Sequence, residues 1–458
     1  MKKFLAIILA LLLLVLMLPM TAAAEDGVYP VSSEAELRTA LNGLTETDSQ
    51  ITVTLENDIT ISDGSLPVNQ GTLTILGQGH TLCSSHHAIL GINGSAVVNL
   101  GAADGSDTLI LTSTDDTSGV VGVSGTSVLN MYKGVTVKNS ESTSQAAGIQ
   151  VNGPAVFNMH GGVIENCVVS MEVPVAGGVH IDGNSTFNMY DGTIQNCSGV
   201  LRGAVSVSGV TQGHPDVSGK AGFHMYGGTI KDCQNKNRGG GAISASTDQP
   251  VSVVIDGGTI SGCSGTLGGA IYIYFSNEDA TAEINNAVIA GNSAIAGGGV
   301  FVSKGTLTIA DGVALYNNTA TDAGDDLYNN GSGAVIVLGK TGSGLTLSSC
   351  GHTIDGWYYD GDSDGAPRWS SSECSEGAED HMTAYEMIGV PNPAECGLKA
   401  AHGAQKNGGG VIIIEPEDPA EPEEPEDNPA TGTNDFVSAA VAVAAVSLLG
   451  MAAVLRKK

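Results

Sequence analysis

The sequence predicts an all-β fold: a right-handed parallel β-helix, or solenoid, with an N-terminal helical cap and a small C-terminal module. A short pattern of alternating apolar and polar residues recurs every 25 to 36 residues between Leu129 and Ile309. Glycine turns divide each repeat into three short stretches, and no helical pattern separates them as a βαβ sheet would require. The 64 glycines and only 7 Phe among 458 residues suit the many turns and narrow core of a solenoid.

Each repeat carries a Met or Ile at the end of its first predicted strand and a small polar or sulfur residue eight positions later. The first strands are Leu129-Asn130-Met131, Phe157-Asn158-Met159, Phe187-Asn188-Met189, Phe223-His224-Met225, Val253-Val254-Ile255, Glu283-Ile284 and Leu307-Thr308-Ile309. The later residues are Asn139, Cys167, Cys197, Cys233, Cys263, Asn292 and Asn317. We expect each strand to pair with its equivalent in the next coil, about 4.8 Å away. We further expect the asparagines to form an inward ladder at a bend, with the four cysteines in the same column as small buried hydrophobes.

The solenoid is expected to occupy residues 25–342. Glu34 to Leu44 has helix-forming residues and apolar spacing, and predicts a short helix that covers the open end of the first coil. The alternating segment Ile51 to Ile61 then begins the stack. Residues 343–410 break the period, and we interpret them as an irregular C-terminal cap or small β module.

The two ends of the chain indicate export followed by retention. Residues 1–24 contain Lys2-Lys3, an apolar run and a small-residue end at Ala24, the pattern of a secretory signal peptide; a retained N-terminal helix is the alternative. Residues 433–458 contain an uncharged span from Phe436 to Leu455 and a basic tail, which predicts a transmembrane segment with the body outside. Residues 411–427 are acidic and proline-rich, typical of an extended linker.

A short motif precedes the apolar span. Its residues are Asn428, Pro429, Ala430, Thr431 and Gly432. The order of motif, span and basic tail resembles the sorting signal of Gram-positive cell-wall proteins. This resemblance implies a sortase as partner, cleavage between Thr431 and Gly432, and attachment of Thr431 to cell-wall peptide. The usual motif begins with Leu rather than Asn, which leaves the sortase class open, and a plain membrane anchor is the alternative.

The body of the chain resembles two groups of surface proteins. The pairing of Gly-Gly-Ala-Ile at Gly240–Ile243 and Gly268–Ile271 with Ile-Ala-Gly-Asn at Ile289–Asn292 resembles the repeats of polymorphic outer-membrane adhesins of intracellular bacteria. The whole body is similar to the pectate-lyase-like β-helix proteins of Gram-positive gut bacteria. The first resemblance covers roughly residues 120–330. It implies a fold and a surface role, and no catalytic residue.

Composition and charge narrow the possible functions. A net charge of −30 excludes a nucleic-acid binder that depends on attraction to phosphates. Glycan hydrolysis requires two carboxylates at defined separation, yet Asp182, Asp191 and Asp256 have no acid at the equivalent position of either neighbouring coil. Asp325 and Asp326 are adjacent, so on a strand they would face opposite ways. We therefore assign no catalytic residue.

Basic residues give no clearer indication of an enzyme. A lyase that acts on an acidic polysaccharide would need cations beside its substrate. Arg202 and Arg238 lie near predicted turns, and we expect neither to have an equivalent in the next coil. We therefore expect the solenoid to bind a ligand rather than to catalyse a reaction.

One outward column is the candidate ligand face: Tyr132, His160, Tyr190 and Tyr226 follow the first strands of four consecutive repeats. Stacked rings on a flat parallel sheet provide a surface against which sugar rings can lie; the alternative is that the rings only stack on one another and protect the sheet. The longest repeat places an insertion at Gly209–Gly222, with His214, beside this column. We expect the insertion and the column to contact a glycan or a host-surface ligand.

No metal or cofactor site is predicted. Asp360, Asp362 and Asp364 match the start of a calcium loop, but its twelfth position is Ser371 rather than Glu, so a solvated turn is favoured and calcium binding stays open.

The cysteines outside the repeats number four. Cys350, Cys374 and Cys396 are candidates for one disulfide, and Cys83 is left over.

Taken together, the sequence predicts an exported, wall-anchored surface protein that acts as an adhesin or glycan-binding module. The alternatives are a β-helix polysaccharide lyase or glycoside hydrolase, and a purely structural surface spacer.

Overall fold

The structure is a computed structural model, and it describes residues 27–85, 88–114, 119–209, 221–342, 345–347, 352–361, 368 and 383–401. The predicted signal peptide, acidic linker, sorting motif and transmembrane span lie outside these residues. The chain divides after Ile413, and every described residue belongs to the first unit. Among these residues, no helix has the length and apolarity needed to span a membrane.

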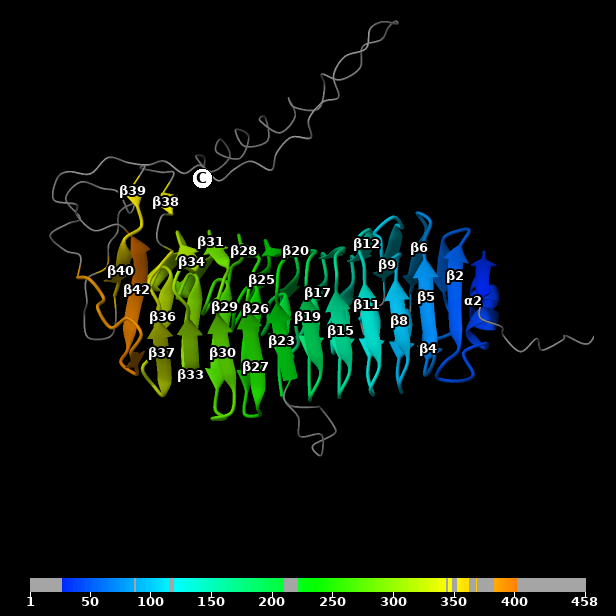
Figure 1. Cartoon of the computed structure of the whole chain (residues 1–458), viewed down its shortest axis with the longest axis horizontal. Helices are drawn as coiled ribbons and strands as arrows, with labels where there is room; N and C mark the ends of the chain where they lie inside the picture. Colours follow the sequence, from blue (N-terminus) through cyan, green and yellow to red (C-terminus); the bar gives the residue numbers. More distant parts are fainter. Residues whose placement is uncertain are drawn as a thin grey trace, which may run out of the picture. The chain divides into compact units, whose positions relative to one another are not determined.

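The described part is a parallel β-solenoid, and the predicted all-β fold is confirmed (Figure 1). Its strands form four faces, named here face A to face D. Face A contains β1 (Gly27–Val31), β2 (Gln50–Leu55), β5 (Thr72–Leu76), β8 (Val97–Leu100), β11 (Val128–Met131), β15 (Val156–Met159), β19 (Thr186–Met189), β23 (Ala221–Met225), β27 (Val251–Ile255), β30 (Thr281–Ile284), β33 (Val300–Ile309) and β37 (Ala334–Leu338). Every pairing between consecutive strands of face A is parallel.

The chain leaves face A through a glycine turn and enters face B. Face B contains β3 (Ile59–Ile61), β6 (Thr81–Ser84), β9 (Leu109–Ser113), β12 (Val135–Lys138), β16 (Val163–Glu165), β20 (Thr193–Gln195), β24 (Thr229–Lys231), β28 (Thr259–Ser261), β31 (Val288–Ala290) and β34 (Ala314–Tyr316). The turn requires glycine: Gly162 has a φ of 87°, and a Cβ there would lie 2.5 Å from the carbonyl oxygen of Val135.

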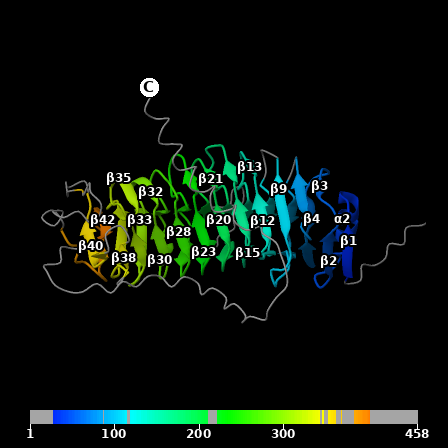
Figure 2. The same cartoon turned by 90° about the horizontal axis from the view of Figure 1, so that it is seen from above.

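Two further faces complete each coil. Face D is short and contains β13 (Glu141–Ser142), β17 (Val168–Val169), β21 (Ser198–Gly199), β25 (Gln234–Asn235), β32 (Ser293–Ala296) and β35 (Thr319–Ala323), which Figure 2 shows along one side. Face C contains β4 (Leu66–Val68), β7 (Leu90–Ile92), β10 (Val121–Val123), β14 (Ile149–Val151), β18 (Val179–Ile181), β22 (Val205–Val207), β26 (Ile243–Thr247), β29 (Ile271–Phe275) and β36 (Leu327–Asn329), with the first half of β33. A turn then returns the chain to face A.

The core is a set of stacked columns. Phe157 and Phe187 lie inside face A with ring centroids 4.7 Å apart, and Phe187 stacks on Phe223 at 5.1 Å. All three are fully buried, because side chains alternate in and out along a strand and the register keeps equivalent residues in line. The repeat read from the sequence is therefore the repeat of the solenoid.

The corner between faces B and D differs from the prediction. Asn139 and Asn317 are exposed and adopt left-handed backbone conformations, with φ of 52° and 55°. Val137 follows Met131 by six positions, whereas the equivalent Ile164 follows Met159 by five. Counting eight positions from the Met therefore stops one residue early in a coil with the longer turn. The prediction of an inward ladder position is wrong for Asn139 and Asn317. It is confirmed for Asn292, which is buried.

The inward column at this corner contains Ser140, Cys167, Cys197, Cys233, Cys263, Asn292 and Asn318. The four cysteines are buried in this column, as predicted, and they are unbridged. Near the C-terminal end the column becomes polar: the side-chain amide of Asn292 donates to Oδ1 of Asn318 at 2.9 Å. The interior is apolar in the middle and hydrogen-bonded near its end.

The two ends of the solenoid depart from its parallel strands: a helix lies at the N-terminal end and antiparallel strands lie at the C-terminal end. Helix α2 (Glu34–Leu41) buries Leu37, Ala40 and Leu41, and Ser33 caps it by accepting from the amide of Glu36. At the other end β42 (Cys396–Ala401) pairs antiparallel with β36 and with β40 (Gly356–Tyr359). The short strands β38 (Thr346–Leu347), β39 (His352–Thr353) and β41 (Pro391–Asn392) also pair antiparallel.

Candidate functional site

The candidate site is the outer surface of face A from β8 to β27, the middle of the solenoid in Figure 1. Three rows of side chains run across these strands, one coil after another. In β11, β15 and β19 the aliphatic and threonine row begins the strand, the amide row follows two residues later, and the aromatic row stands just beyond the strand end. β8 adds Val97 and Asn99 to the first two rows, and Tyr226 after β23 adds a ring to the third. Strict parallel register places these rows side by side.

The aromatic row contains the four residues predicted from the sequence. Tyr132 stacks on His160 with ring centroids 5.1 Å apart, and His160 stacks on Tyr190 at 5.0 Å. Tyr190 stacks on Tyr226 at 5.0 Å, and the angles between successive planes are 13°, 3° and 6°. The prediction that these four residues form one column is confirmed. Whether they bind a ligand stays a prediction.

The rings form an exposed ridge. Tyr190 and Tyr226 keep 42% and 43% of their surface in water. Neighbouring rings cover part of each other's faces, so the ridge offers ring edges and the outer parts of the faces to a ligand. The packing also lowers the pKa of His160 through partial burial, which favours the neutral imidazole and keeps positive charge out of the row.

The amide row was not predicted as a row. The Nδ2 atom of each asparagine donates to Oδ1 of the one in the preceding coil at 2.9 Å, from Asn188 to Asn158, from Asn158 to Asn130 and from Asn130 to Asn99. Asn99 in turn donates to Thr74 at 3.2 Å. The signal was present in the sequence, since an asparagine stands before the Met or Leu that ends each of these strands. The alternation of apolar and polar residues predicts that these asparagines face outward, and it does not reveal the hydrogen bonds between coils.

The amide row ends at Asn188, and the aromatic row ends one coil later, at Tyr226. His224 occupies the next position of the amide row, and its Nε2 atom lies 2.6 Å from Oδ2 of Asp256, which occupies the next position of the aromatic row. Asn285 donates to Oδ1 of Asp256 at 2.8 Å, and the ring of His224 stacks on Tyr226 at 3.9 Å. The hydrogen bonds from His224 and Asn285 lower the pKa of Asp256. Partial burial and the charges of Tyr190 and Asp256 raise the pKa of Tyr226.

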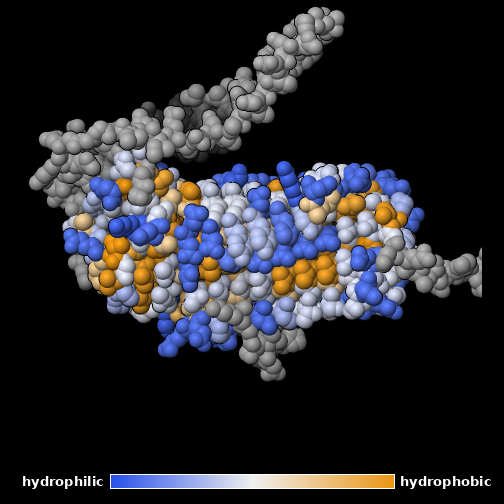
Figure 3. All heavy atoms as spheres, viewed as in Figure 1, coloured by the Kyte–Doolittle hydropathy of each residue, from blue (hydrophilic) through white to orange (hydrophobic). Residues whose placement is uncertain are grey.

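The aliphatic row completes the surface. Val97, Val128 and Val156 pair in register and are half-buried. Figure 3 shows a hydrophobic patch over β8, β11 and β15, bordered by hydrophilic surface. Apolar, amide and aromatic groups therefore lie next to one another in parallel lines.

The chemistry available here is that of binding. The acids on this side of the solenoid have the neighbours expected from the sequence: Asp256 lies between Tyr226 and Asn285, and Asp182 lies between Asn152 and Ser208. Within the described ranges, no group of three or more His, Cys, Asp or Glu residues is arranged to hold a metal ion. The hydrogen-bonded pair of His224 and Asp256 lies on an open ridge.

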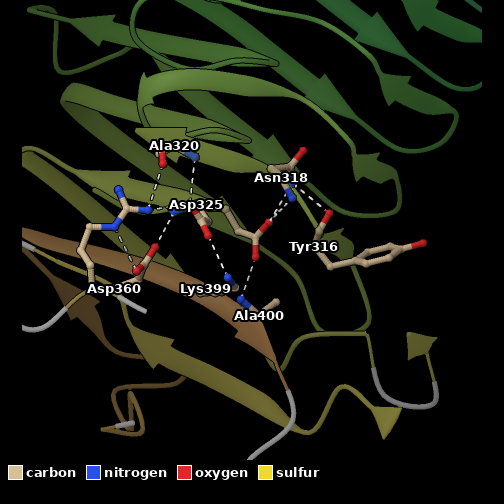
Figure 4. Close-up of polar contacts among 9 residues, drawn as sticks. Tyr316, Asn318, Ala320, Asp325, Asp360, Lys399 and Ala400 are labelled. Carbon is tan, nitrogen blue, oxygen red and sulfur yellow. Dashed lines mark hydrogen bonds and ion pairs between the residues drawn. The ribbon is translucent and has the colours of Figure 1, made fainter. Parts of the chain in front are cut away.

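The densest group of charges lies elsewhere, at the C-terminal end of the solenoid (Figure 4). Asp325 accepts from Nζ of Lys399 at 2.8 Å and from Arg368 at 2.7 Å. Asp326 accepts from the amide nitrogens of Asn318 and Ala400. The two neighbouring acids point to different partners, in keeping with the predicted opposite orientation, and both are buried.

Asp360 belongs to this charged group. It is fully buried, accepts from the amide of Asp325 at 2.8 Å, and lies 3.3 Å from Nε of Arg368. Its carboxylate therefore faces protein groups, which disfavours a role as calcium ligand. Asp362, Asp364 and Ser371 lie outside the described residues.

Burial controls protonation in this group. It raises the pKa of Asp326 to about 7, against the lowering effect of hydrogen bonds from Asn318 and Ala400. It also raises the pKa of Asp360, and the nearby charge of Asp325 adds to this effect. The carboxylates raise the pKa of Lys399 although its own burial opposes this. The group joins β42 to the last coil, which is a structural role.

Arg202 and Arg238 lie in the loops that lead from face D to face C. Ser198 of β21 pairs with Gln234 of β25, and the two arginines each follow their paired residue by four positions. Beyond these loops Val205 pairs with Ile243, so the second loop is two residues longer than the first. That neither arginine has an equivalent in the next coil therefore stays a prediction.

Several other predicted features lie partly or wholly outside the residues that the structure describes. The insertion Gly209–Gly222 is described only at its two ends, and His214 lies in the undescribed part. Cys350 and Cys374 also lie outside, while Cys396 is buried. Cys83 is half-buried and unbridged.

Comparison of the chain with protein-family models, with curated proteins and with solved structures finds no match.

Proposed function

We propose that this protein is a cell-surface glycan-binding protein, with the outer surface of face A as its binding surface. The observation that supports this most is the ridge of four stacked rings, Tyr132, His160, Tyr190 and Tyr226, beside an unbroken row of asparagine amides. Aromatic rings with adjacent amides suit sugars, whose C–H groups pack on rings while their hydroxyls exchange hydrogen bonds.

The spacing of the ridge favours an extended polymer. Successive rings stand 5.0 to 5.1 Å apart, similar to the length of one hexose unit in an extended glycan. A linear chain along the solenoid axis would therefore meet the same ring and amide at each unit. Each bonded asparagine retains a second N–H for such a chain.

The ends of the chain extend the proposal. We infer that residues 1–24 direct export and that a sortase joins Thr431 to cell-wall peptide, as the motif from Asn428 to Gly432 implies. On this account the protein is an adhesin-like surface module. The coil is inferred to be right-handed, since parallel crossovers have that hand. Helix α2 and the antiparallel strands around β42 would cap its two ends.

An enzyme is the second candidate, because of one observation. The 2.6 Å pair of His224 and Asp256 lies at the end of the ridge, where a base oriented by a carboxylate could act on a bound glycan. The open position of the pair disfavours this, since hydrolases and lyases surround their reacting bond.

The proposal is tested by applying the purified protein to a glycan array while assaying the same polysaccharides for release of reducing or unsaturated ends. Binding without release is the expected result. Release that is lost in a His224→Gln variant would establish the enzyme instead. Failure to bind any glycan, with no release, would leave the spacer role and contradict the proposal.

A further inference from the structure

The charged group at the C-terminal end of the solenoid contains a buried lysine. Lys399 lies on β42 and keeps 5% of its surface in water, and among the described residues it is the one lysine that is buried. Its Nζ atom lies 2.8 Å from Oδ2 of Asp325, which is 6% exposed (Figure 4). Removing two ions from water costs free energy that their mutual attraction often fails to return. An amine and a carboxyl group are therefore held in contact where neither is well solvated.

The backbone holds these two side chains on adjacent strands. Leu327 of β36 pairs antiparallel with Leu398 of β42, and the amide of Asp326 donates to the carbonyl of Leu398 at 3.1 Å. The amide of Asp325 donates to Oδ2 of Asp360 at 2.8 Å, which fixes the backbone at the carboxylate. Groups held together in this way react as if each were present at a very high concentration around the other.

The second oxygen of the Asp325 carboxylate is bound by two donors. Oδ1 accepts from the amide of Ala320 at 2.8 Å and from Nη2 of Arg368 at 2.7 Å. When an amine adds to the carboxyl carbon, negative charge develops on this oxygen. Donors already directed at such an oxygen stabilise the tetrahedral intermediate of acyl transfer. Oδ2, the oxygen that contacts Lys399, is thereby left as the one that departs.

We propose that Lys399 and Asp325 condense into an isopeptide bond, which joins β42 covalently to the last coil. The ammonium of Lys399 first passes a proton to Oδ2 of Asp325 along their hydrogen bond. Nζ then forms a bond to Cγ, and the bond from Cγ to Oδ2 breaks. Two of the three ammonium protons leave with Oδ2 as one water, and the third stays on the amide nitrogen. Nothing is oxidised or reduced, and no co-reactant is required.

The neighbouring groups accommodate the loss of this ion pair. Burial raises the pKa of Asp360, and the charge of Asp325 adds to this effect, which favours a protonated Asp360 before the reaction. Afterwards Nε of Arg368, 3.3 Å from Asp360, has this carboxyl group as its partner. Burial opposes a charged Lys399, yet the carboxylates raise its pKa, so the ammonium is the resting form. The reaction must therefore begin with transfer of a proton to Asp325.

The bond would close a covalent ring from residue 325 to residue 399. Tension on the C-terminal end of the chain would then pass from Lys399 directly to Asp325 and bypass the residues between them. Strand β42 is paired with β36 and β40 through hydrogen bonds, and it would stay attached even if these bonds broke. The inference does not depend on the glycan-binding proposal.

The experiment is peptide mass spectrometry of the full-length protein after reduction, denaturation and digestion with trypsin. Trypsin cuts after lysine and arginine, so residues 305–340 and residues 369–399 become separate peptides when their side chains are free. An amide on Lys399 blocks cleavage at that residue. The bond therefore yields residues 305–340 joined to residues 369–406, at the sum of their masses less one water.

Two other modifications are distinguished by the same measurement. Residues 305–340 contain no cysteine, so a disulfide cannot be the link. A succinimide at Asp311–Gly312 would also remove one water, but it would join no second peptide. Fragmentation of the joined peptide should place the branch at Asp325 and Lys399.

Three variants assign the bond. Lys399→Arg keeps the positive charge but cannot supply a neutral amine, and Asp325→Ala removes the carboxyl group. Lys340→Arg, at an exposed lysine beside β37, keeps the trypsin site and is the matched control. We expect the joined peptide in the native protein and in Lys340→Arg, and its loss in the other two variants. Recovery of only the unjoined peptides from the native protein would overturn the proposal, whether or not the variants fold. A joined peptide that persists in Lys399→Arg or Asp325→Ala would overturn it as well.

Discussion

Nε2 of His224 lies 2.6 Å from Oδ2 of Asp256, and the two residues take the positions that follow the last asparagine and the last ring of face A. In the coils of β11, β15 and β19 an asparagine and a ring occur together. Beyond them this hydrogen-bonded pair takes their place, and Asn285 donates to the carboxylate from the following coil. The ridge therefore has a defined polar end, and its length is set by the sequence rather than by the length of the solenoid.

The His224–Asp256 pair should be visible in the titration of Asp256. The lowered pKa of this carboxyl means that its contribution to stability is present above its ordinary pKa and is lost as pH falls through the lowered value. His224→Gln should move the pKa of Asp256 upward, as measured by carboxyl NMR. His80→Gln, which removes a histidine 3.5 Å from Asp58, is the control and should leave Asp256 unchanged. An unchanged Asp256 in His224→Gln would show that the pair does not form in solution.

The amide row should contribute to stability through its middle members. Asn158 donates to Asn130 and accepts from Asn188, so Asn158→Ala removes two hydrogen bonds. Because the row is partly exposed, we expect a loss of about 1–2 kcal/mol in the free energy of unfolding, measured by urea denaturation. Asn69→Ala, at an exposed asparagine outside the row, should change stability by less than about 0.5 kcal/mol. Equal effects of the two variants would contradict a bonded row.

The four cysteines of the inward column should be inert in the folded protein. Cys167, Cys197, Cys233 and Cys263 are at most 1% exposed. Alkylation of the native protein followed by peptide mass spectrometry should leave them unmodified, since a thiolate must be accessible to react. Denaturation before alkylation should expose all four. Rapid labelling of any of them in the native state would contradict their position in the core.

The buried carboxyl of Asp326 predicts a particular dependence of stability on pH. Burial raises its pKa from 3.8 to about 7, against hydrogen bonds from Asn318 and Ala400 and the nearby charge of Lys399. Between these values the folded state binds a proton that the unfolded state releases, so this group's contribution to stability is present at low pH and is lost as pH rises toward 7. Unfolding free energies measured across this range should therefore fall more with rising pH in the native protein than in Asp326→Asn. The opposite difference would contradict the burial of Asp326.

The solenoid could be predicted from the sequence because the same alternation of inward and outward residues recurs in coil after coil. Leu129, Phe157, Phe187 and Phe223 do occupy equivalent inward positions, and the rings beyond their strands do stack. Each coil supplied an independent instance of the same alternation. A pattern that repeats in register fixes which face of the strand is buried.

Features that depend on one coil were harder to predict. Asn139 and Asn317 were misplaced because a turn in each of their coils contains one residue more, which a fixed count cannot detect. The pairing of His224 with Asp256 joins different rows, so alignment of equivalent positions alone did not reveal it. The group around Asp325 involves Lys399, 74 residues away along the chain. Contacts of this kind arise from packing and have no local signal.

The central claim is that the ridge of face A binds an extended glycan. Binding isotherms of a glycan selected on the array should be measured for the native protein, for the Tyr190→Ala, Tyr226→Ala double variant, and for Tyr274→Ala, which removes an exposed tyrosine of face C. Each stacked ring should contribute about 0.5–1.5 kcal/mol beyond its buried area, so the double variant should bind at least about tenfold more weakly. Tyr274→Ala should bind like the native protein. Equal affinity of the double variant and the native protein would contradict the account.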